Sequence, residues 1–122
     1  MKSFASAAVL SACLCGAALA QTGLPSYQGD PSVYKVVFED QNFRMIIGTW
    51  PAGMTDKPHT HPLAFVVYAI TDCKQKLHQA NGSVVDIEQK AGATMAGIPT
   101  PQPHTAENVG TAECRVLFVE RK

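Results

Sequence analysis

Charge of either sign is scarce in this sequence, and neither sign dominates. Only 16% of its 122 residues are charged, and ten Lys and Arg balance ten Asp and Glu. Without a basic surplus the chain has no electrostatic attraction for nucleic acid or an anionic membrane surface, so neither is expected as a partner. The motifs G-x-S-x-G, G-x-x-x-x-G-K-[ST], C-x-x-C and H-E-x-x-H are also missing, which excludes the common serine hydrolases, nucleotide-binding proteins and zinc proteases.

Long apolar runs are confined to the N-terminus, where residues 4–20 carry no charge. The run follows Lys2 and ends in Ala-Leu-Ala, the small-x-small pattern that signal peptidase accepts. We therefore expect residues 1–20 to be a cleaved signal peptide and the protein to be periplasmic or secreted, without stable membrane insertion after cleavage. Two alternatives stay open: the run is kept as an anchor, or Cys13 is lipidated within a lipobox-like Leu-Ser-Ala-Cys.

A sustained apolar period of 3.6 residues is absent as well, which argues against helices. Residues 21–31, rich in Gly, Pro and polar side chains, predict an extended arm before a single domain at 32–122. Within that domain, short β-type runs separated by turn residues predict an all-β sandwich or barrel. The expected strands are 33–38, 43–50, 65–71, 74–79, 83–88, 94–98, 104–109 and 114–120.

Three details of these strands are predicted from local pattern. The nearly continuous apolar run 65–71 is typical of a strand buried on both faces or in a sandwich core. The dipeptide Asn81-Gly82 predicts a hairpin with a type I′ turn. Residues 99–103 contain three Pro and predict a loop.

Three of the four His occur as His59-x-His61 and as His104 after a Pro. Residues i and i+2 of an extended segment project from the same face, so His59 and His61 can converge on one point. A third imidazole from another strand would complete a set of nitrogen donors suited to Fe, Mn, Ni, Cu or Zn. By itself the pattern also fits two surface His in a polar loop.

The context of these His resembles the first motif of the cupin superfamily. That motif reads Gly, five residues, then His-x-His, and five residues separate Gly53 from His59 here. The family's Glu ligand would fall at Phe65 or Val66, and neither side chain can bind a metal. Phe65 would instead give the pocket an apolar wall.

The second cupin motif is matched around His104. Gly92 opens it, Pro99 stands five residues before His104, and Asn108 follows after three residues. Pro101 replaces the family's Gly. The resemblance implies a single cupin jelly-roll barrel in which His59, His61 and His104 form a three-His metal site.

Such a site would keep the metal's full positive charge and favour a small anionic compound, with chemistry resembling that of oxygenases. Phe65, Val67 and Met54 are the expected pocket residues, and no general base is evident beside the His motif. The alternative is a non-catalytic barrel that binds or senses a small molecule, with the metal site lost. Small cupins commonly pair through their sheets, so a homodimer is expected, with strand 33–38 as a candidate for exchange.

The cysteines give one further expectation. After removal of the signal, Cys73 and Cys114 are the remaining pair, and an even number in an oxidising compartment favours a disulfide. The cupin topology implies that the final strand lies antiparallel to strand 65–71, which brings the two cysteines together. Two free, partly buried thiols are the alternative.

Overall fold

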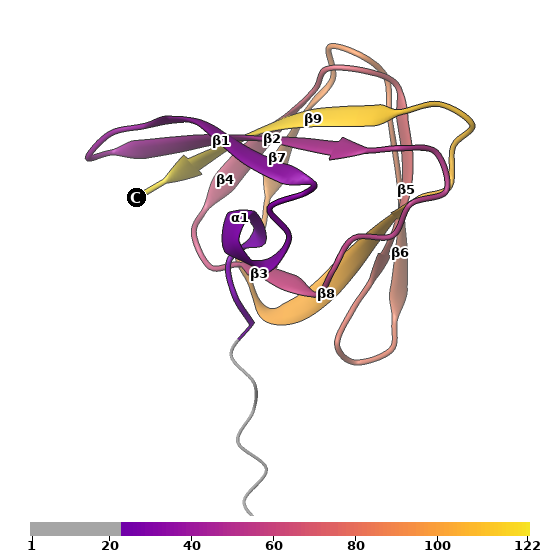
Figure 1. The fold of residues 1–122 in the computed structure, drawn as a ribbon, viewed down its shortest axis with the longest axis horizontal. Helices are drawn as coiled ribbons and strands as arrows, with labels where there is room; N and C mark the ends of the chain where they lie inside the picture. Colours follow the sequence, from indigo (N-terminus) through magenta and orange to yellow (C-terminus); the bar gives the residue numbers. More distant parts are fainter. Residues whose placement is uncertain (1–22) are drawn as a thin grey trace, which may run out of the picture.

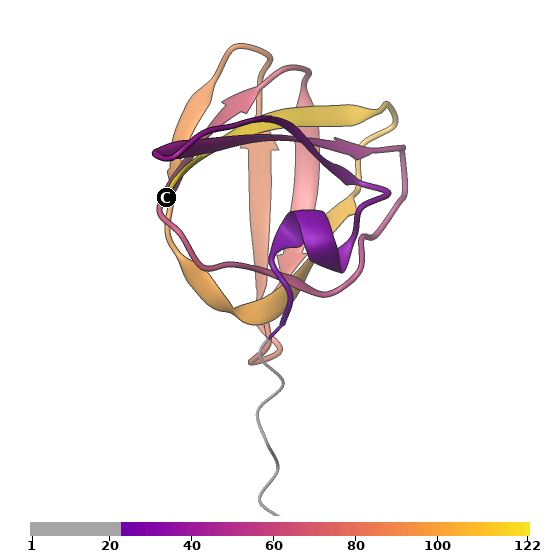
Figure 2. The same ribbon diagram turned by 60° about the vertical axis from the view of Figure 1, so that its left-hand side comes forward.

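A computed structural model describes residues 23–122, so the expected signal peptide, the alternative lipidation at Cys13 and the first two residues of the arm lie outside the described residues. Two antiparallel sheets face each other (Figures 1 and 2). One sheet has the strand order β1-β2-β9-β4-β7 and the other β3-β8-β5-β6. The elements are α1 (Ser26–Gly29), β1 (Tyr34–Glu39), β2 (Phe43–Trp50), β3 (His59–His61), β4 (Phe65–Ala69), β5 (Cys73–His78), β6 (Val84–Gln89), β7 (Thr94–Gly97), β8 (Thr100–Asn108) and β9 (Cys114–Arg121).

The alternation of side chains along each strand places the core between the sheets. In β9, buried and half-buried residues alternate, with Cys114, Val116, Phe118 and Glu120 facing inward. The buried hydrophobic cluster consists of Val33, Tyr34, Ile46, Trp50, Val67, Cys73, Ala106, Cys114, Val116 and Phe118. The predicted all-β jelly roll is thus confirmed.

The predicted disulfide joins Cys73 to Cys114, the first residues of β5 and β9. The strand pairing from which this disulfide was predicted is also present, because β4 and β9 pair antiparallel, with Ala69 opposite Val116. The bond links a strand of one sheet to a strand of the other, and both residues are buried.

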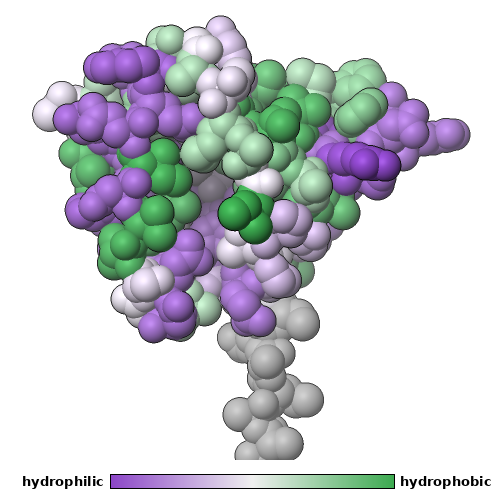
Figure 3. Space-filling model, turned by 180° about the vertical axis from the view of Figure 1, so that it is seen from behind, coloured by the Kyte–Doolittle hydropathy of each residue, from purple (hydrophilic) through white to green (hydrophobic). Residues whose placement is uncertain are grey.

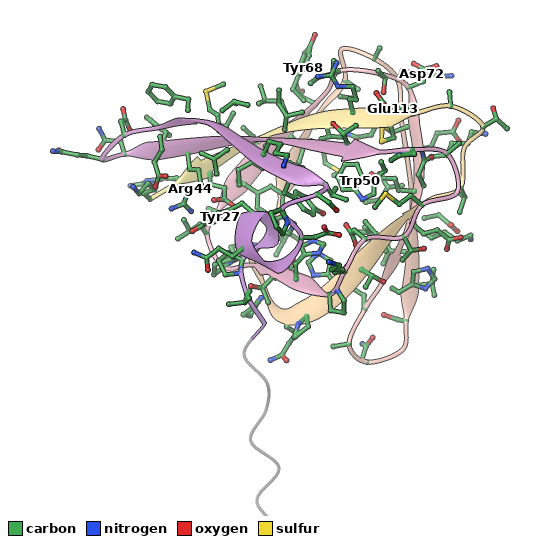
Figure 4. The ribbon with its side chains drawn as sticks, viewed as in Figure 1. Tyr27, Arg44, Trp50, Tyr68, Asp72 and Glu113 are labelled. Atoms are coloured by element: carbon green, nitrogen blue, oxygen red, sulfur yellow. A yellow bond between two sulfur atoms is a disulfide. The ribbon has the colours of Figure 1, made fainter. Side chains whose placement is uncertain are left out.

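The structure decides between two alternatives for one strand and corrects a prediction about another. Strand β4 lies in the sandwich core and is not buried on both faces: Val67 and Ala69 are buried, whereas Val66 and Tyr68 are exposed, because the outer face of this sheet has no covering layer within the described chain. Figure 4 shows Tyr68 pointing away from the barrel. Residues 99–103 are not a loop, since β8 begins at Thr100. Its Pro-containing start pairs only with β3, so the missing proline N–H groups face a free edge.

Two local conformations also differ from the predictions. The arm is not extended throughout, because Ser26–Gly29 form one helical turn that packs on β3. Asp30 ends this turn, and its Oδ2 accepts a hydrogen bond of 2.9 Å from the Lys57 backbone N–H. The Asn81-Gly82 turn is not type I′, because only Gly82 has a positive φ, of 84°. Its N–H donates to the Gln79 carbonyl, as in a type I turn followed by a glycine bulge.

Candidate metal centre

Strands β3 and β8 bring the three predicted His side chains together. His59 lies opposite His104 in the ladder, and His61 lies two residues farther along β3. The ring centres of His59 and His104 are 4.5 Å apart, and His61 lies 5.1 and 5.3 Å from them. One nitrogen from each ring lies within 4.8 Å of the others, and all three residues are buried. The predicted donor set therefore exists as one cluster.

Each imidazole turns its Nδ1 toward an oxygen. Nδ1 of His59 lies 2.9 Å from the Lys57 carbonyl, and Nδ1 of His104 lies 3.4 Å from the Gln102 carbonyl. Nδ1 of His61 lies 3.9 Å from Oε1 of Glu120. Metal-binding His commonly donates one ring N–H to a carbonyl or carboxylate and binds the metal through the other nitrogen. The ring orientations thus leave Nε2 of His61 and of His104 without a partner among the described residues, whereas Nε2 of His59 lies 2.9 Å from the Tyr34 hydroxyl, which would have to turn away to let all three nitrogens bind a metal. With that one change the donor set fits a metal.

A buried carboxylate organises the floor of this cluster. Asp56 accepts hydrogen bonds from the Tyr34 hydroxyl at 2.8 Å, the Trp50 indole N–H at 3.0 Å and the Ala106 backbone N–H at 2.7 Å. The same Tyr34 hydroxyl lies 2.9 Å from Nε2 of His59. Its single proton can go to the carboxylate or to the imidazole, so Tyr34 couples Asp56 to the His cluster.

A second buried carboxylate, Glu120, lies on the other side of His61. Glu120 lies on β9 and faces inward, directly opposite Phe65 on β4. Phe65 is one of the two positions at which the cupin motif would have its Glu, so this carboxylate comes from the neighbouring strand. Its Oε2 accepts a hydrogen bond of 3.1 Å from Arg44, whereas its Oε1 and Nδ1 of His61 have no hydrogen-bond partner among the described residues. Arg44 itself stacks over Tyr27, 4.4 Å from the ring centre (Figure 4).

These carboxylates correct two expectations. No general base was evident beside the His motif, yet Asp56 and Glu120 each lie within 4.0 Å of an imidazole nitrogen. A bound metal would also not keep its full charge unopposed. The signal in the sequence was weak: Glu120 and Asp56 are single polar residues, and only the inward parity of Glu120 with Phe118 and Val116 marks it.

Burial sets the protonation of the cluster. Loss of water lowers the pKa of His59, His61 and His104, and the neighbouring carboxylates only partly oppose this effect at His59 and His61. Burial, and then the charge of Asp56, raises the pKa of Tyr34 well above its ordinary value. The imidazoles are therefore held neutral, which is the form that binds a metal.

A cavity of about 80 Å³ opens from the cluster into the barrel, which is room for several waters. Phe65 and Val67 line it, together with Trp50 and Phe118. Met54 does not line it, contrary to the prediction, because the turn at residues 51–53 leads its side chain onto the core. Phe65 packs so closely on Gly97 that a Cβ there would lie 2.0 Å from the ring, so Gly97 is what lets the ring fill this wall. Figure 3 shows a recess on the far face of the molecule.

Burial of the imidazoles makes stability sensitive to mild acid. A His whose pKa is lowered by folding contributes nothing above the unfolded pKa, near 6.5, where both states are neutral. Below it the unfolded state binds the proton first, so stability is lost as the pH falls. Each such His costs up to about 1.4 kcal/mol per pH unit. We expect the unfolding free energy of the metal-free protein to decline as the pH falls below about 6.5.

Denaturant unfolding at several pH values measures this slope. The variant His61→Gln removes one of the three groups and should make the slope shallower. His78, half-exposed and bonded to Glu107, provides the matched control His78→Gln. A slope that persists in His61→Gln but disappears in His78→Gln would contradict the assignment.

No protein-family model matches the chain, and no curated protein matches it in sequence. Solved structures do match. A cupin domain from Bordetella pertussis Tohama I is 20% identical, with a TM-score of 0.66 over 74% of this chain and 92% of that chain.

Two other solved structures have a similar fold. An RmlC-like cupin with a double-stranded β-helix fold from Methanocaldococcus jannaschii is 12% identical, with a TM-score of 0.57 over 73% of this chain and 78% of that chain. The polyketide cyclase RemF from Streptomyces resistomycificus is 17% identical, with a TM-score of 0.56 over 80% of this chain and 68% of that chain. These similarities show that the described part of the chain has the cupin fold.

Proposed function

We propose that this cupin-fold protein is an exported metalloprotein that binds, and acts on, a small anionic compound. His59, His61 and His104 would hold one divalent transition metal. The observation that carries the proposal is that one ring nitrogen from each of the three buried His lies within 4.8 Å of the other two, while each Nδ1 faces a protein oxygen. Neutral imidazoles suit Fe, Mn, Ni, Cu and Zn alike, and the site chemistry does not choose among them.

The charges around the cluster support an anionic partner. Glu120 is already paired with Arg44, which leaves Asp56 as the nearest uncompensated carboxylate. A divalent metal would therefore retain about one net positive charge in a buried site, and a monoanionic group could balance it.

When bound, the metal would supply Lewis acidity and, if it is redox-active, oxygenase-like chemistry. The chain's own residues would position the compound and manage protons. The Tyr34 hydroxyl donates to Asp56 and lies 2.9 Å from Nε2 of His59, so its proton can move between the carboxylate and the imidazole. Phe65, Val67 and Phe118 form apolar walls that exclude bulk water.

One observation favours a second function, a non-catalytic small-molecule-binding barrel without metal. Both ring nitrogens of His59 already have hydrogen-bond partners within the protein, Lys57 on one side and Tyr34 on the other. A relic site held by such bonds would keep the cavity and lose the chemistry.

Metal content decides between the two functions. Elemental analysis of protein purified from the periplasm without a His tag should find close to one Fe, Mn, Ni, Cu or Zn per chain. The double variant His61→Ala/His104→Ala should contain none, because two of three donors are gone, and His78→Ala should match the wild type. Metal-free wild type that also takes up no added metal would leave the binding barrel as the function.

The same sample tests the two remaining parts of the proposal. Intact mass would show whether residues 1–20 have been removed, as export through a cleaved signal requires. For residues 23–122, no helix is long and apolar enough to cross a membrane. Sedimentation would show whether two copies pair, which the exposed Val37 and Phe38 of β1 and Val66 and Tyr68 of β4 support. A mass that includes residues 1–20 would contradict export through a cleaved signal, and a monomer would contradict pairing of two copies.

A further inference from the structure

We infer that the side-chain amides of Gln75 and Gln89 recognise an uncharged carbonyl oxygen of the compound that occupies the cavity. The inference rests on the proposed function for the end of the compound that binds at the His cluster. It assigns binding residues to the other end of the compound, for which the proposed function names none.

The two amides are buried without partners. Gln75 and Gln89 are 7% and 8% exposed, and the Nε2 atom of each has no hydrogen-bond partner among the described residues. Both residues line the same cavity as the three His. A buried donor without a partner costs stability, so two of them in one cavity indicate groups kept for a ligand.

Strand register puts the two amides within reach of one ligand atom. Gln75 lies opposite Ile87, and Gln89 lies opposite Cys73, so the two Gln are diagonal neighbours on adjacent strands. Diagonal residues on one face of an antiparallel pair are about 7–8 Å apart, which long side chains can bridge. The two Nε2 atoms are enclosed by protein, and half a turn of each amide about its Cγ–Cδ bond exchanges nitrogen and oxygen. With both amides turned in this way, two N–H donors can converge on one carbonyl oxygen, which has two lone pairs.

The rest of the lining indicates that this oxygen is uncharged. Of the described residues, none that line the cavity is Lys, Arg, Asp or Glu. A second anionic group placed far from the His cluster would have no cation to compensate it, and burial of an unpaired charge is strongly unfavourable. A neutral carbonyl needs only the hydrogen bonds that the two amides offer.

The register also gives the size of the compound. Gln75 lies opposite Asn108 in β8, four residues beyond His104. At about 3.3 Å per residue this is roughly 13 Å along the strand, and the side chains at both ends shorten the span. The compound class is therefore a ring or short chain, mostly apolar, with an anionic metal-binding group at one end and a carbonyl at the other.

Two probes of equal shape test the amide end in protein freed of metal with a chelator. Cyclohexanone has the carbonyl, and methylenecyclohexane replaces its oxygen by carbon. Titrations followed by NMR report the side-chain NH2 signals of Gln75 and Gln89, and the indole N–H of Trp50, the single tryptophan, reports entry into the cavity. We expect the ketone to bind about tenfold tighter than the alkene and to shift both amide signals.

The double variant Gln75→Leu/Gln89→Leu should bind both probes equally and be no less stable than the wild type. Gln41→Leu, in the exposed turn after β1, is the matched control and should keep the preference. The pair Gln75→Met/Gln89→Met preserves side-chain length if the Leu pair does not fold. The inference is overturned by equal affinities in the wild type, by a preference that survives the double variant, or by no shift of the amide signals.

The elemental analysis and metal-uptake test proposed above are a separate measurement. Protein that prefers the ketone but takes up no metal keeps this inference and loses the proposed function. Protein that takes up metal but does not distinguish the two probes keeps the proposed function and loses this inference.

Discussion

Removal of the Cys73–Cys114 disulfide is expected to lower the unfolding free energy by about 4 kcal/mol. The bond closes a loop with a sequence separation of 41 residues, so it removes much of the freedom of the unfolded chain. It also joins β5 of one sheet to β9 of the other, and both cysteines are buried in the core. For a domain of this size the loss corresponds to a decrease of about 20 °C in Tm.

The measurement compares oxidised protein with protein unfolded, reduced and refolded in reductant, and with Cys73→Ala/Cys114→Ala. Reductant should have no effect on the double variant. Thiol titration of denatured protein should find two more thiols after reduction than before. Cys13 and Cys15, outside the described residues, add a constant two if residues 1–20 are retained. Two reactive thiols at 73 and 114 without reductant, or a stability unchanged by reduction, would argue against the bond's role.

The second large effect is expected at Asp56. Its carboxylate is the shared acceptor for Tyr34, Trp50 and the Ala106 backbone N–H. Truncation to Ala leaves the Trp50 indole N–H and the Ala106 backbone N–H buried without a partner, each costing about 1–3 kcal/mol, whereas the Tyr34 hydroxyl can still donate to Nε2 of His59. Part of this cost is recovered because a charge no longer has to be buried. We expect Asp56→Ala to destabilise the protein by about 4 kcal/mol.

Denaturant unfolding measures this effect, with Asp86→Ala as the control. Asp86 is exposed and, among residues 23–122, pairs only with Lys76, so its loss should change stability by about 0.5 kcal/mol or less. Asp56→Asn keeps the shape but places an NH2 against at least one of the donors, so it should fall between the wild type and Asp56→Ala. An Asp56→Ala variant as stable as Asp86→Ala would show that the three donors find other partners.

The fold was predictable because its evidence is local. Period-two alternation and turn residues predicted the ends of most strands to within one or two positions, and both ends of β2 were predicted correctly. Failures occurred where the neighbouring strands decide. Proline was expected to end strand pairing at residues 99–103, but a strand with a free edge tolerates it. The apolar run of β4 fitted a strand covered on both faces as well as one in a sandwich core, because no local pattern reports that its outer face lacks a second layer.

The candidate site divides in the same way. His59, His61 and His104 could be named from the sequence because two are neighbours in an extended segment and the third stands in a recognisable motif. Gln75, Gln89 and Glu120 could not, since each is a single polar residue whose inward parity acquires meaning only when other strands surround it.

The sequence by itself determined the fold class, the three His donors and, through the family resemblance, the cysteine pair. Each of these follows from residue types at short, regular spacings. The tertiary structure alone decided what surrounds the donors: the Asp56 carboxylate against Tyr34, Glu120 opposite Phe65, and the two amides deep in the cavity. These contacts join residues far apart in the chain, and their energies depend on burial and on facing partners that arise only when the two sheets close.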